Sequence, residues 1–291
     1  MQSQLPGGVS VGGPEGNCVG TQHMGKSEAG KAESAKSSGD DLTGRRILIT
    51  GAARNIGSSL ARRLYDRGAS VGLLGLEPEL LEQVATSCGR APWQLCDVAD
   101  LEQVSRGVDY IAEKLGGIDV VVANAGVEAN SSILGGDPAD MRRAVEVNLM
   151  GTYYTLRAAG PHISHENGYA LVVASAHGAA KHPFRGPFGA SRAGVEALGD
   201  ALRLEMKHLG TKVGVAYIGD IDTDTTALSF DGARGTLASV GTTTVADAVD
   251  AFERGIVGRK SRVHAPRRSA AVRHIAQRAI DLRPSHIRGV A

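Results

Sequence analysis

A turn rich in small residues follows the first apolar run of the chain. Residues 50–57 read Thr-Gly-Ala-Ala-Arg-Asn-Ile-Gly, and a helix-like pattern begins directly after them. Small residues allow a backbone to approach a pyrophosphate closely, and the N-terminus of a helix offers unpaired N–H groups with a partial positive charge. The alternative is a turn with a purely structural role. Because strand-like and helix-like segments alternate downstream, the turn predicts binding of a nucleotide.

The elements that must position this turn alternate regularly from Arg45 onward. Short β-type runs are separated by segments of helical length, which is typical of a parallel sheet covered by helices on both faces. The runs that we expect to be strands are 46–50, 70–75, 93–96, 118–126, 169–175 and 213–219. Apolar residues at helical spacing predict helices at 58–67 and 193–209. No linker divides this part of the chain, so we expect one α/β domain with a doubly wound, Rossmann-like parallel sheet.

The two ends of the chain differ in composition from this domain, which we place at residues 42–265. Residues 1–41 are rich in Gly, Ser and Lys and lack periodic apolar positions, which predicts a disordered tail rather than a signal peptide. Residues 266–291 carry many Arg residues against one acid, with apolar residues at helical spacing. This pattern favours a basic helical extension that closes a substrate pocket. The alternative is a helix that lies on an anionic membrane surface.

Charge and cysteine content exclude several classes of function. Lys and Arg total 32 against 31 Asp and Glu, so the formal net charge of +1 favours no nucleic-acid partner. The cysteines, Cys18, Cys88 and Cys96, form no C-x-x-C pair, so neither a disulfide framework nor a metal site is expected. No apolar run approaches the roughly 20 residues of a membrane-spanning helix. These features predict a cytoplasmic protein.

The turn and three further motifs resemble those of the short-chain dehydrogenase/reductase family over residues 42–223. The family's turn reads T-G-x-x-x-G-x-G, and Asn55 stands at its middle Gly. Asn tolerates a positive φ better than most residues, so the turn can keep its shape. The cofactor-binding residues that the resemblance implies are Thr50, Gly51, Arg54, Asn55, Ile56 and Gly57 in the turn, Asp97 and Val98 at the adenine, Asn124, Ala125 and Gly126 beside the cofactor, and Thr223 at the nicotinamide carboxamide.

The resemblance also bears on which dinucleotide binds. NADP-using members of the family place a basic residue against the 2′-phosphate, and Arg54 resembles it. NAD-using members end the second strand with an acid that holds the ribose 2′-OH. The run 70–75 instead ends in Gly75, and Leu76 follows. NADP(H) is therefore favoured over NAD(H), and the alternative is that Arg54 is simply a solvent-exposed residue.

Family members reduce carbonyls or oxidise alcohols with an Asn, a Ser and a Tyr-x-x-x-Lys pair. Asn148 and Ser175 match the Asn that orders the Lys and the Ser that binds the substrate oxygen. Phe188 stands where the Tyr is expected, and Arg192 stands where the Lys is expected. The literal Tyr-x-x-x-Lys at 110–114 precedes the fourth predicted strand, so we do not expect it to be catalytic.

The two replacements change the chemistry that the site can perform. A phenyl ring has no proton to donate, and an arginine does not deprotonate, although Arg192 can still donate to ribose hydroxyls. Another group must then supply the proton. His177 is the leading candidate because it lies two residues after Ser175 and imidazole titrates near neutral pH, and His182 follows on the same loop. The alternative is that both are surface histidines.

We therefore expect an NADP(H)-binding oxidoreductase that acts on an alcohol or ketone of a largely apolar small molecule, with an atypical proton donor. The alternative is a non-redox enzyme of this fold, catalysing elimination, isomerisation or cyclisation, or a catalytically silent subunit. The glycine-containing segment 223–241 is expected to form a lid over the substrate. The resemblance further implies a homodimer or homotetramer.

Overall fold

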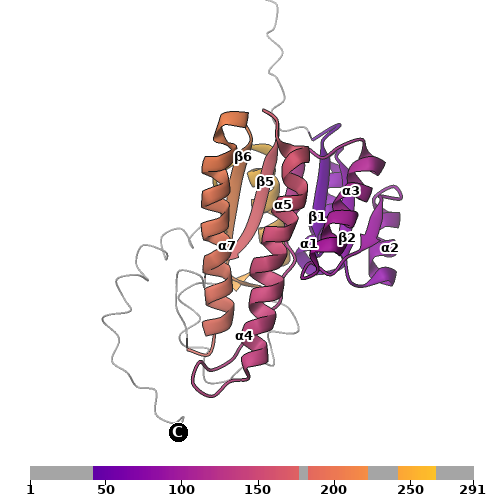
Figure 1. Ribbon diagram of the computed structural model, residues 1–291. Helices are drawn as coiled ribbons and strands as arrows, with labels where there is room; N and C mark the ends of the chain where they lie inside the picture. Colours follow the sequence, from indigo (N-terminus) through magenta and orange to yellow (C-terminus); the bar gives the residue numbers. More distant parts are fainter. Residues whose placement is uncertain (1–41, 177–182, 222–241, 267–291) are drawn as a thin grey trace, which may run out of the picture. The chain divides into compact units, whose positions relative to one another are not determined.

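A seven-stranded parallel sheet forms the centre of the domain (Figure 1). The structure, a computed structural model, describes residues 42–176, 183–221 and 242–266. The strands are β1 (Arg46–Thr50), β2 (Ser70–Gly75), β3 (Trp93–Leu95), β4 (Val120–Ala123), β5 (Tyr169–Ser175), β6 (Lys212–Ile218) and β9 (Arg262–Ala265). They pair in the order β3-β2-β1-β4-β5-β6-β9, and every pair is parallel. The direction of winding reverses between β1 and β4, and α/β proteins bind ligands in the crevice at such a point.

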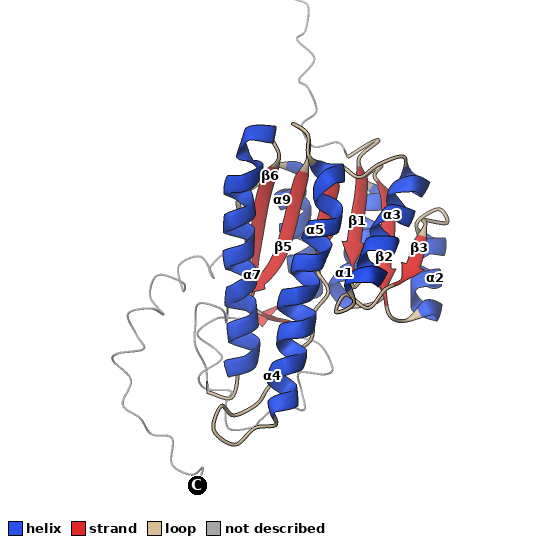
Figure 2. Cartoon of the chain, viewed as in Figure 1, coloured by secondary structure: helices blue, strands red, loops and turns tan. Residues whose placement is uncertain are grey.

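Helices cover both faces of the sheet (Figure 2). One face carries α1 (Asn55–Asp66), α2 (Pro78–Ser87) and α9 (Val245–Val257), and the other carries α3 (Leu101–Leu115), α5 (Gly151–Ile163) and α7 (Gly186–Glu205). Ile47 and Ile49 of β1 pack into the first layer, whereas Leu48 packs into the second. Since successive side chains of a strand point to opposite faces and both faces are covered, the three central residues of β1 are all apolar.

One continuous helical segment, residues 138–163, passes the carboxyl ends of the strands. The helix α4 (Pro138–Ala144), the π-helical turn η1 (Val145–Met150) and α5 follow one another directly. Widened turns of this kind occur frequently at functional sites, and η1 contains Asn148. Together, α4 and the start of α7 extend past the carboxyl end of β5 (Figure 1).

The predicted fold class is confirmed, because the sheet is parallel and helices flank both of its faces. The strands predicted at 70–75 and 169–175 have the predicted bounds. The run 118–126 is longer than the strand it contains, since β4 ends at Ala123 and the rest of the run forms a wall of the site. The helix predicted from residue 193 begins at Gly186, because the Pro and Gly residues of its first turn weaken the helical pattern.

The sequence analysis missed β9, which lies at the edge of the sheet. Its side chains alternate between half-buried Arg262 and His264 and buried Val263 and Ala265. Alternation over four residues is a weak signal, and here it lies within a basic stretch. A short second sheet, formed by β7 (Asp220–Ile221) and β8 (Thr242–Thr243), was also not predicted.

Several predictions fall on residues outside the described part of the chain. These are the tail at 1–41, the histidines His177 and His182, Thr223 with the lid at 223–241, and the basic extension from residue 267 onward. Among the helices that the structure does describe, none combines the length and the apolar character that crossing a membrane requires.

Candidate functional site

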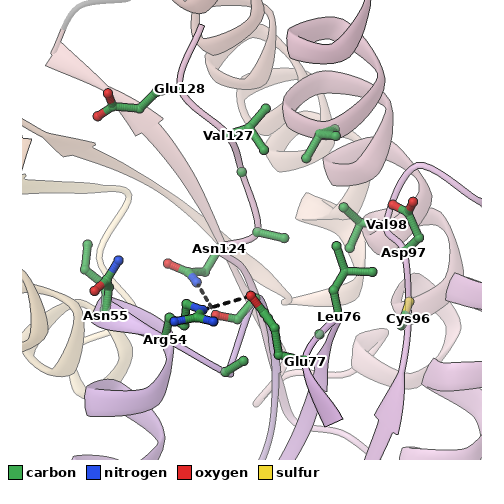
Figure 3. A pocket seen from close by; sticks show the side chains of 18 of the residues that line it. Arg54, Asn55, Leu76, Glu77, Cys96, Asp97, Val98, Asn124, Val127 and Glu128 are labelled. Atoms are coloured by element: carbon green, nitrogen blue, oxygen red, sulfur yellow. Dashed lines mark hydrogen bonds and ion pairs between the residues drawn. The ribbon is translucent and has the colours of Figure 1, made fainter. Parts of the chain in front are cut away.

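A cleft of about 460 Å³ lies at the carboxyl ends of the central strands. Its walls come from the turn after β1 and from the segments 75–77, 96–98 and 124–128 that follow β2, β3 and β4 (Figure 3). These segments meet because the carboxyl ends of parallel strands lie at one edge of the sheet. The predicted cofactor-binding residues that line the cleft are Gly51, Arg54, Asn55, Ile56, Gly57, Asp97, Val98, Asn124, Ala125 and Gly126.

The turn after β1 has the conformation that a phosphate-binding turn needs. Gly51 and Asn55 both have positive φ angles, +65° and +48°. A Cβ atom at Gly57 would lie 2.0 Å from the carbonyl oxygen of Gly51, so only glycine fits there. No side chain caps the N-terminus of α1, and its first turn contains no acidic residue. The free N–H groups at this helix end can therefore bind the pyrophosphate of a dinucleotide.

Hydrogen bonds from the segment after β4 hold this turn in place. The backbone N–H groups of Asn124 and Ala125 each donate to Thr50 Oγ1 over 3.1 Å. The Asn124 side chain donates to the carbonyl oxygens of Thr50 and Gly51 over 3.0 and 3.3 Å. Thr50 therefore lies behind the cleft wall and links β1 to β4.

Asp97 and Val98 line the cleft beside Leu76 and Cys96 (Figure 3). The Asp97 carboxylate accepts the backbone N–H of Ala99, which leaves room for a ligand at its second oxygen. Beside it, burial raises the pKa of the Cys96 thiol to about 12, with a smaller effect from Asp97. Cys96 is therefore a neutral wall residue at physiological pH and a poor nucleophile.

An ion pair that was not predicted stands at the rim of the cleft. Arg54 Nε lies 2.9 Å from Glu77 Oε1, and 62% and 40% of the two side chains are exposed (Figure 3). Glu77 follows β2 by two residues, beyond the position at which an acid was sought in the sequence. It lines the cleft, so the strand end is not free of acid as the sequence analysis assumed.

A smaller cleft of about 150 Å³ adjoins the first one. Both are lined by Ile56, Asn124, Gly126, Val127, Glu128 and Ile221. Ser175, Phe188 and Arg192 line only the smaller cleft, together with Arg185 and Asp220. The Ser175 hydroxyl donates to the carbonyl oxygen of Ile218 over 3.1 Å. The structure thus brings three of the predicted catalytic residues to one cavity beside the proposed dinucleotide site.

Two guanidinium groups lie over the Phe188 ring. The Cζ atoms of Arg192 and Arg185 lie 5.3 and 5.7 Å from its centroid, distances at which cation–π attraction acts. Phe188 is only 7% exposed, and it packs against Ala129 and Ala144. Arg185 forms an ion pair with Asp220 over 3.0 Å. The position at which the family's Tyr is expected is therefore occupied by a packed aromatic ring.

Asn148 is fully buried, and its side chain makes three hydrogen bonds to neighbouring segments. Its Oδ1 accepts the backbone N–H of Val127, and its Nδ2 donates to the carbonyl oxygen of Val127 and to Ser191 Oγ. Ser191 in turn donates to the carbonyl oxygen of Phe188. In the described part of the chain Asn148 makes no hydrogen bond to Arg192, whose only bond goes to Val173. Asn148 instead ties the segment after β4 to the first turns of α7.

Four charged residues that were not predicted lie beside the predicted site residues. Glu77, Glu128, Arg185 and Asp220 all line one or both clefts. A signal existed for Glu77, Glu128 and Asp220, since each follows closely on the end of a predicted strand. The literal Tyr-x-x-x-Lys at 110–114 lies on α3, away from both clefts, with Lys114 over the Tyr110 ring. No group of residues suited to a metal ion is present in the segments that the structure describes.

Comparison with protein families gives a match over most of the domain. Residues 45–233 match the family model described as short chain dehydrogenase. An uncharacterized oxidoreductase of Staphylococcus saprophyticus is 30% identical over 200 residues, which cover 67% of this chain and 86% of that protein. An uncharacterized oxidoreductase of Staphylococcus aureus is 30% identical over 189 residues, which cover 64% of this chain and 82% of that protein.

Solved structures with the same architecture include three dehydrogenases or reductases. A short-chain type dehydrogenase/reductase from Mycobacterium marinum has a TM-score of 0.60 and 28% identity, covering 62% of this chain and 76% of that one. NAD+-bound xylitol dehydrogenase has a TM-score of 0.68 and 23% identity, covering 75% and 93%. Levodione reductase has a TM-score of 0.71 and 22% identity, covering 79% and 99%.

Proposed function

This chain belongs to the short-chain dehydrogenase family, and we propose that it is an NADP(H)-binding oxidoreductase acting on an alcohol or ketone of a largely apolar small molecule. The family consists of oxidoreductases that bind NAD(P). The observation that carries the proposal is the turn after β1, which combines a positive φ at Gly51, a glycine required at Gly57 and an uncapped helix end. These features suit a pyrophosphate, which needs a close approach to the backbone and free N–H groups.

The apolar character of the substrate is supported by the walls of the smaller cleft. Val173, Ala174, Phe188 and Ile218 contribute aliphatic and aromatic surface to it. A ligand bound there would exchange water for these side chains, which stabilises an apolar body. The Ser175 hydroxyl lies in the same wall and can donate to a substrate oxygen once it turns from Ile218.

The preference for NADP(H) rests on Arg54 and is opposed by Glu77. A guanidinium at the rim attracts a 2′-phosphate, whereas a carboxylate repels the phosphate and accepts a hydrogen bond from a free 2′-OH. Because the two side chains now pair with each other, the preference depends on which of them turns toward the ligand. We propose that Arg54 does so when a 2′-phosphate is present.

Fluorescence titration of the purified chain with NADPH and with NADH tests this proposal. We expect Arg54→Ala to weaken NADPH binding about two- to fivefold and to leave NADH binding nearly unchanged, since an exposed charge contact contributes up to about 1 kcal/mol. Glu77→Gln should strengthen NADPH binding, because it removes the repelling carboxylate. Tighter binding of NADH than NADPH would reverse the assigned preference, and binding of neither at millimolar concentration would refute the dinucleotide site.

At the smaller cleft we assign a separate role to each residue. A bound nicotinamide would supply or accept the hydride. Ser175 binds the substrate oxygen, and Arg192 offers N–H groups to a bound ligand. Asn148 fixes the position of Val127 relative to the start of α7 through its hydrogen bonds to Val127 and Ser191. Phe188 transfers no proton. We propose that His177, which follows β5 by two residues but lies outside the described part, supplies the proton.

A second candidate function is favoured by the surroundings of Phe188. A phenyl ring in contact with Arg185 and Arg192 provides the smaller cleft with no hydroxyl at the position where the resemblance places the proton-transferring Tyr. This arrangement suits a non-redox enzyme that performs an elimination, isomerisation or cyclisation, or a silent subunit that binds the nucleotide without turnover. The effect of restoring Tyr and Lys, given in the Discussion, distinguishes this candidate from the first.

A further inference from the structure

Arg192 is a buried cation with most of its hydrogen-bonding capacity unused. The residue is 7% exposed, and its Nη1 donates to the carbonyl oxygen of Val173 over 2.7 Å. Its Nε has no hydrogen-bond partner. A guanidinium carries five N–H groups, and in the described part of the chain the Val173 carbonyl oxygen is the sole acceptor that Arg192 meets. Buried donors in folded proteins are usually paired, so an unpaired set needs an explanation.

Neither acid of the smaller cleft neutralises Arg192. Asp220 pairs with Arg185 over 3.0 Å. Glu128 is an exposed residue at the junction of the two clefts, and no ion pair joins it to Arg192 within the described segments. Burial lowers the pKa of the Arg192 guanidinium to about 10, with Glu128 opposing the shift, so the group stays charged at neutral pH. The cleft therefore holds a desolvated positive charge that no carboxylate of the described residues contacts.

The surroundings of Arg192 keep this group in one place. Its guanidinium lies over the Phe188 ring at 5.3 Å, and a Cβ atom at Gly126 would lie 2.1 Å from Arg192 Nη2. The missing side chain at Gly126 therefore leaves room for the Arg192 guanidinium, and the Phe188 ring packs against this guanidinium. Gly126 lines both clefts, so Nη2 lies where the two cavities meet.

From these observations we infer that the smaller cleft is a receptor for an organic carboxylate, whose two oxygens accept the unused N–H groups of Arg192. A guanidinium and a carboxylate match as two planar forks with parallel hydrogen bonds. The apolar walls accept the rest of the molecule, and Ser175 lies within the same cavity. The inference rests on the proposed function and narrows its substrate to a hydroxy acid or keto acid with an apolar body.

Calorimetric titration with benzoate, and with benzamide as its neutral counterpart of similar shape, tests the receptor without requiring turnover. We expect benzoate to bind at least tenfold more tightly than benzamide. Arg192→Met should weaken benzoate binding at least tenfold and leave benzamide binding unchanged. The benzoate affinity of Arg192→Lys should lie between those of Arg192→Met and the native protein. Arg157→Met, which removes an exposed arginine on α5, should change neither ligand.

Other results would overturn the inference. Equal binding of benzoate and benzamide, or benzoate binding that survives in both Arg192 variants, would exclude Arg192 as a carboxylate receptor. Loss of benzoate binding in the presence of saturating NADP+ would show that the ribose hydroxyls of the cofactor take these N–H groups instead. Benzoate binding through Arg192 in a chain that binds neither dinucleotide would uphold the receptor and refute the proposed redox function.

Discussion

At the scale of single residues, Phe188 and Arg192 decide which chemistry we propose for the smaller cleft. Phe188 provides no oxygen, and two guanidinium groups lie over its ring. We propose that an arginine at position 192, in place of the family's lysine, provides a planar donor that retains its proton, which suits recognition of an oxyanion better than proton transfer. These residues are thus consistent with a site whose proton donor lies elsewhere.

Restoring the family's pair tests this interpretation. We expect the double variant Phe188→Tyr with Arg192→Lys to gain dehydrogenase activity about a hundredfold or more, because a positioned proton donor contributes roughly 10²–10⁴ in rate. NADPH oxidation would be followed with a broad panel of ketones. Arg192→Lys alone serves as the control, since it supplies an ammonium group but no phenol. If the double variant gains nothing on any substrate, the non-redox candidate is the better one.

At the scale of elements, the β1–α1 connection converts backbone geometry into a binding surface. The turn brings Gly57 against the carbonyl group of Gly51, and Asn124 and Ala125 hold it from behind through Thr50. A helix end that is neither capped nor acidic faces the cleft as a result. Binding at this site therefore depends on how closely α1 approaches β1 and only partly on individual side chains.

Adding one methyl group at Gly57 should distort the turn between β1 and α1. Gly57→Ala places a Cβ 2.0 Å from the Gly51 carbonyl oxygen, so the turn must shift. We expect NADPH affinity to fall at least tenfold and the free energy of unfolding to fall by about 1–3 kcal/mol, as overpacking does elsewhere. Gly160→Ala on α5 is the matched control, because nothing lies within 4 Å of its added Cβ. Unchanged NADPH affinity in Gly57→Ala would mean that the ligand does not use this turn.

At the scale of the whole domain, the edge of the sheet opposite the clefts is held by charged contacts between distant segments. Asp119, just before β4, accepts the backbone N–H and the guanidinium of Arg46 at the start of β1. Arg45 donates to the carbonyl oxygen of Asn167, and Arg259 donates to that of Glu166. Burial raises the pKa of the Asp119 carboxyl, but the hydrogen bonds from Arg46 outweigh it and hold the pKa below its ordinary value of 3.8.

This shift predicts how stability depends on pH. A carboxyl with a lowered pKa in the folded state stabilises the protein above the unfolded value of 3.8, and that contribution is lost as the pH falls through the lowered pKa. We expect Asp119→Asn to reduce the free energy of unfolding by about 1.5–3 kcal/mol at pH 7, since hydrogen bonds to charged groups are lost. Urea unfolding at pH 7 and pH 3 should show a smaller difference between native and variant protein at the lower pH. As a control, Glu113→Gln, which changes an exposed carboxylate on α3, should leave the free energy of unfolding unchanged at both pH values. A stability loss in Asp119→Asn that is equal at pH 7 and pH 3 would contradict the role assigned to the Asp119 carboxylate.

Short-range patterns in the sequence determined the fold class, and together with the family resemblance they identified half of the residues that line the larger cleft. Strands buried on both faces must be apolar throughout, and a phosphate-binding turn must contain small residues, so both features are visible without coordinates. The tertiary structure alone decided that Arg54 pairs with Glu77, that Asn148 binds Val127 and Ser191, and that Arg192 keeps an unpaired donor in the smaller cleft. The physical reason is that the choice of a polar partner depends on which distant segments pack together. Local periodicity reports only which face of each segment is buried, and it carries no information about the groups across the interface.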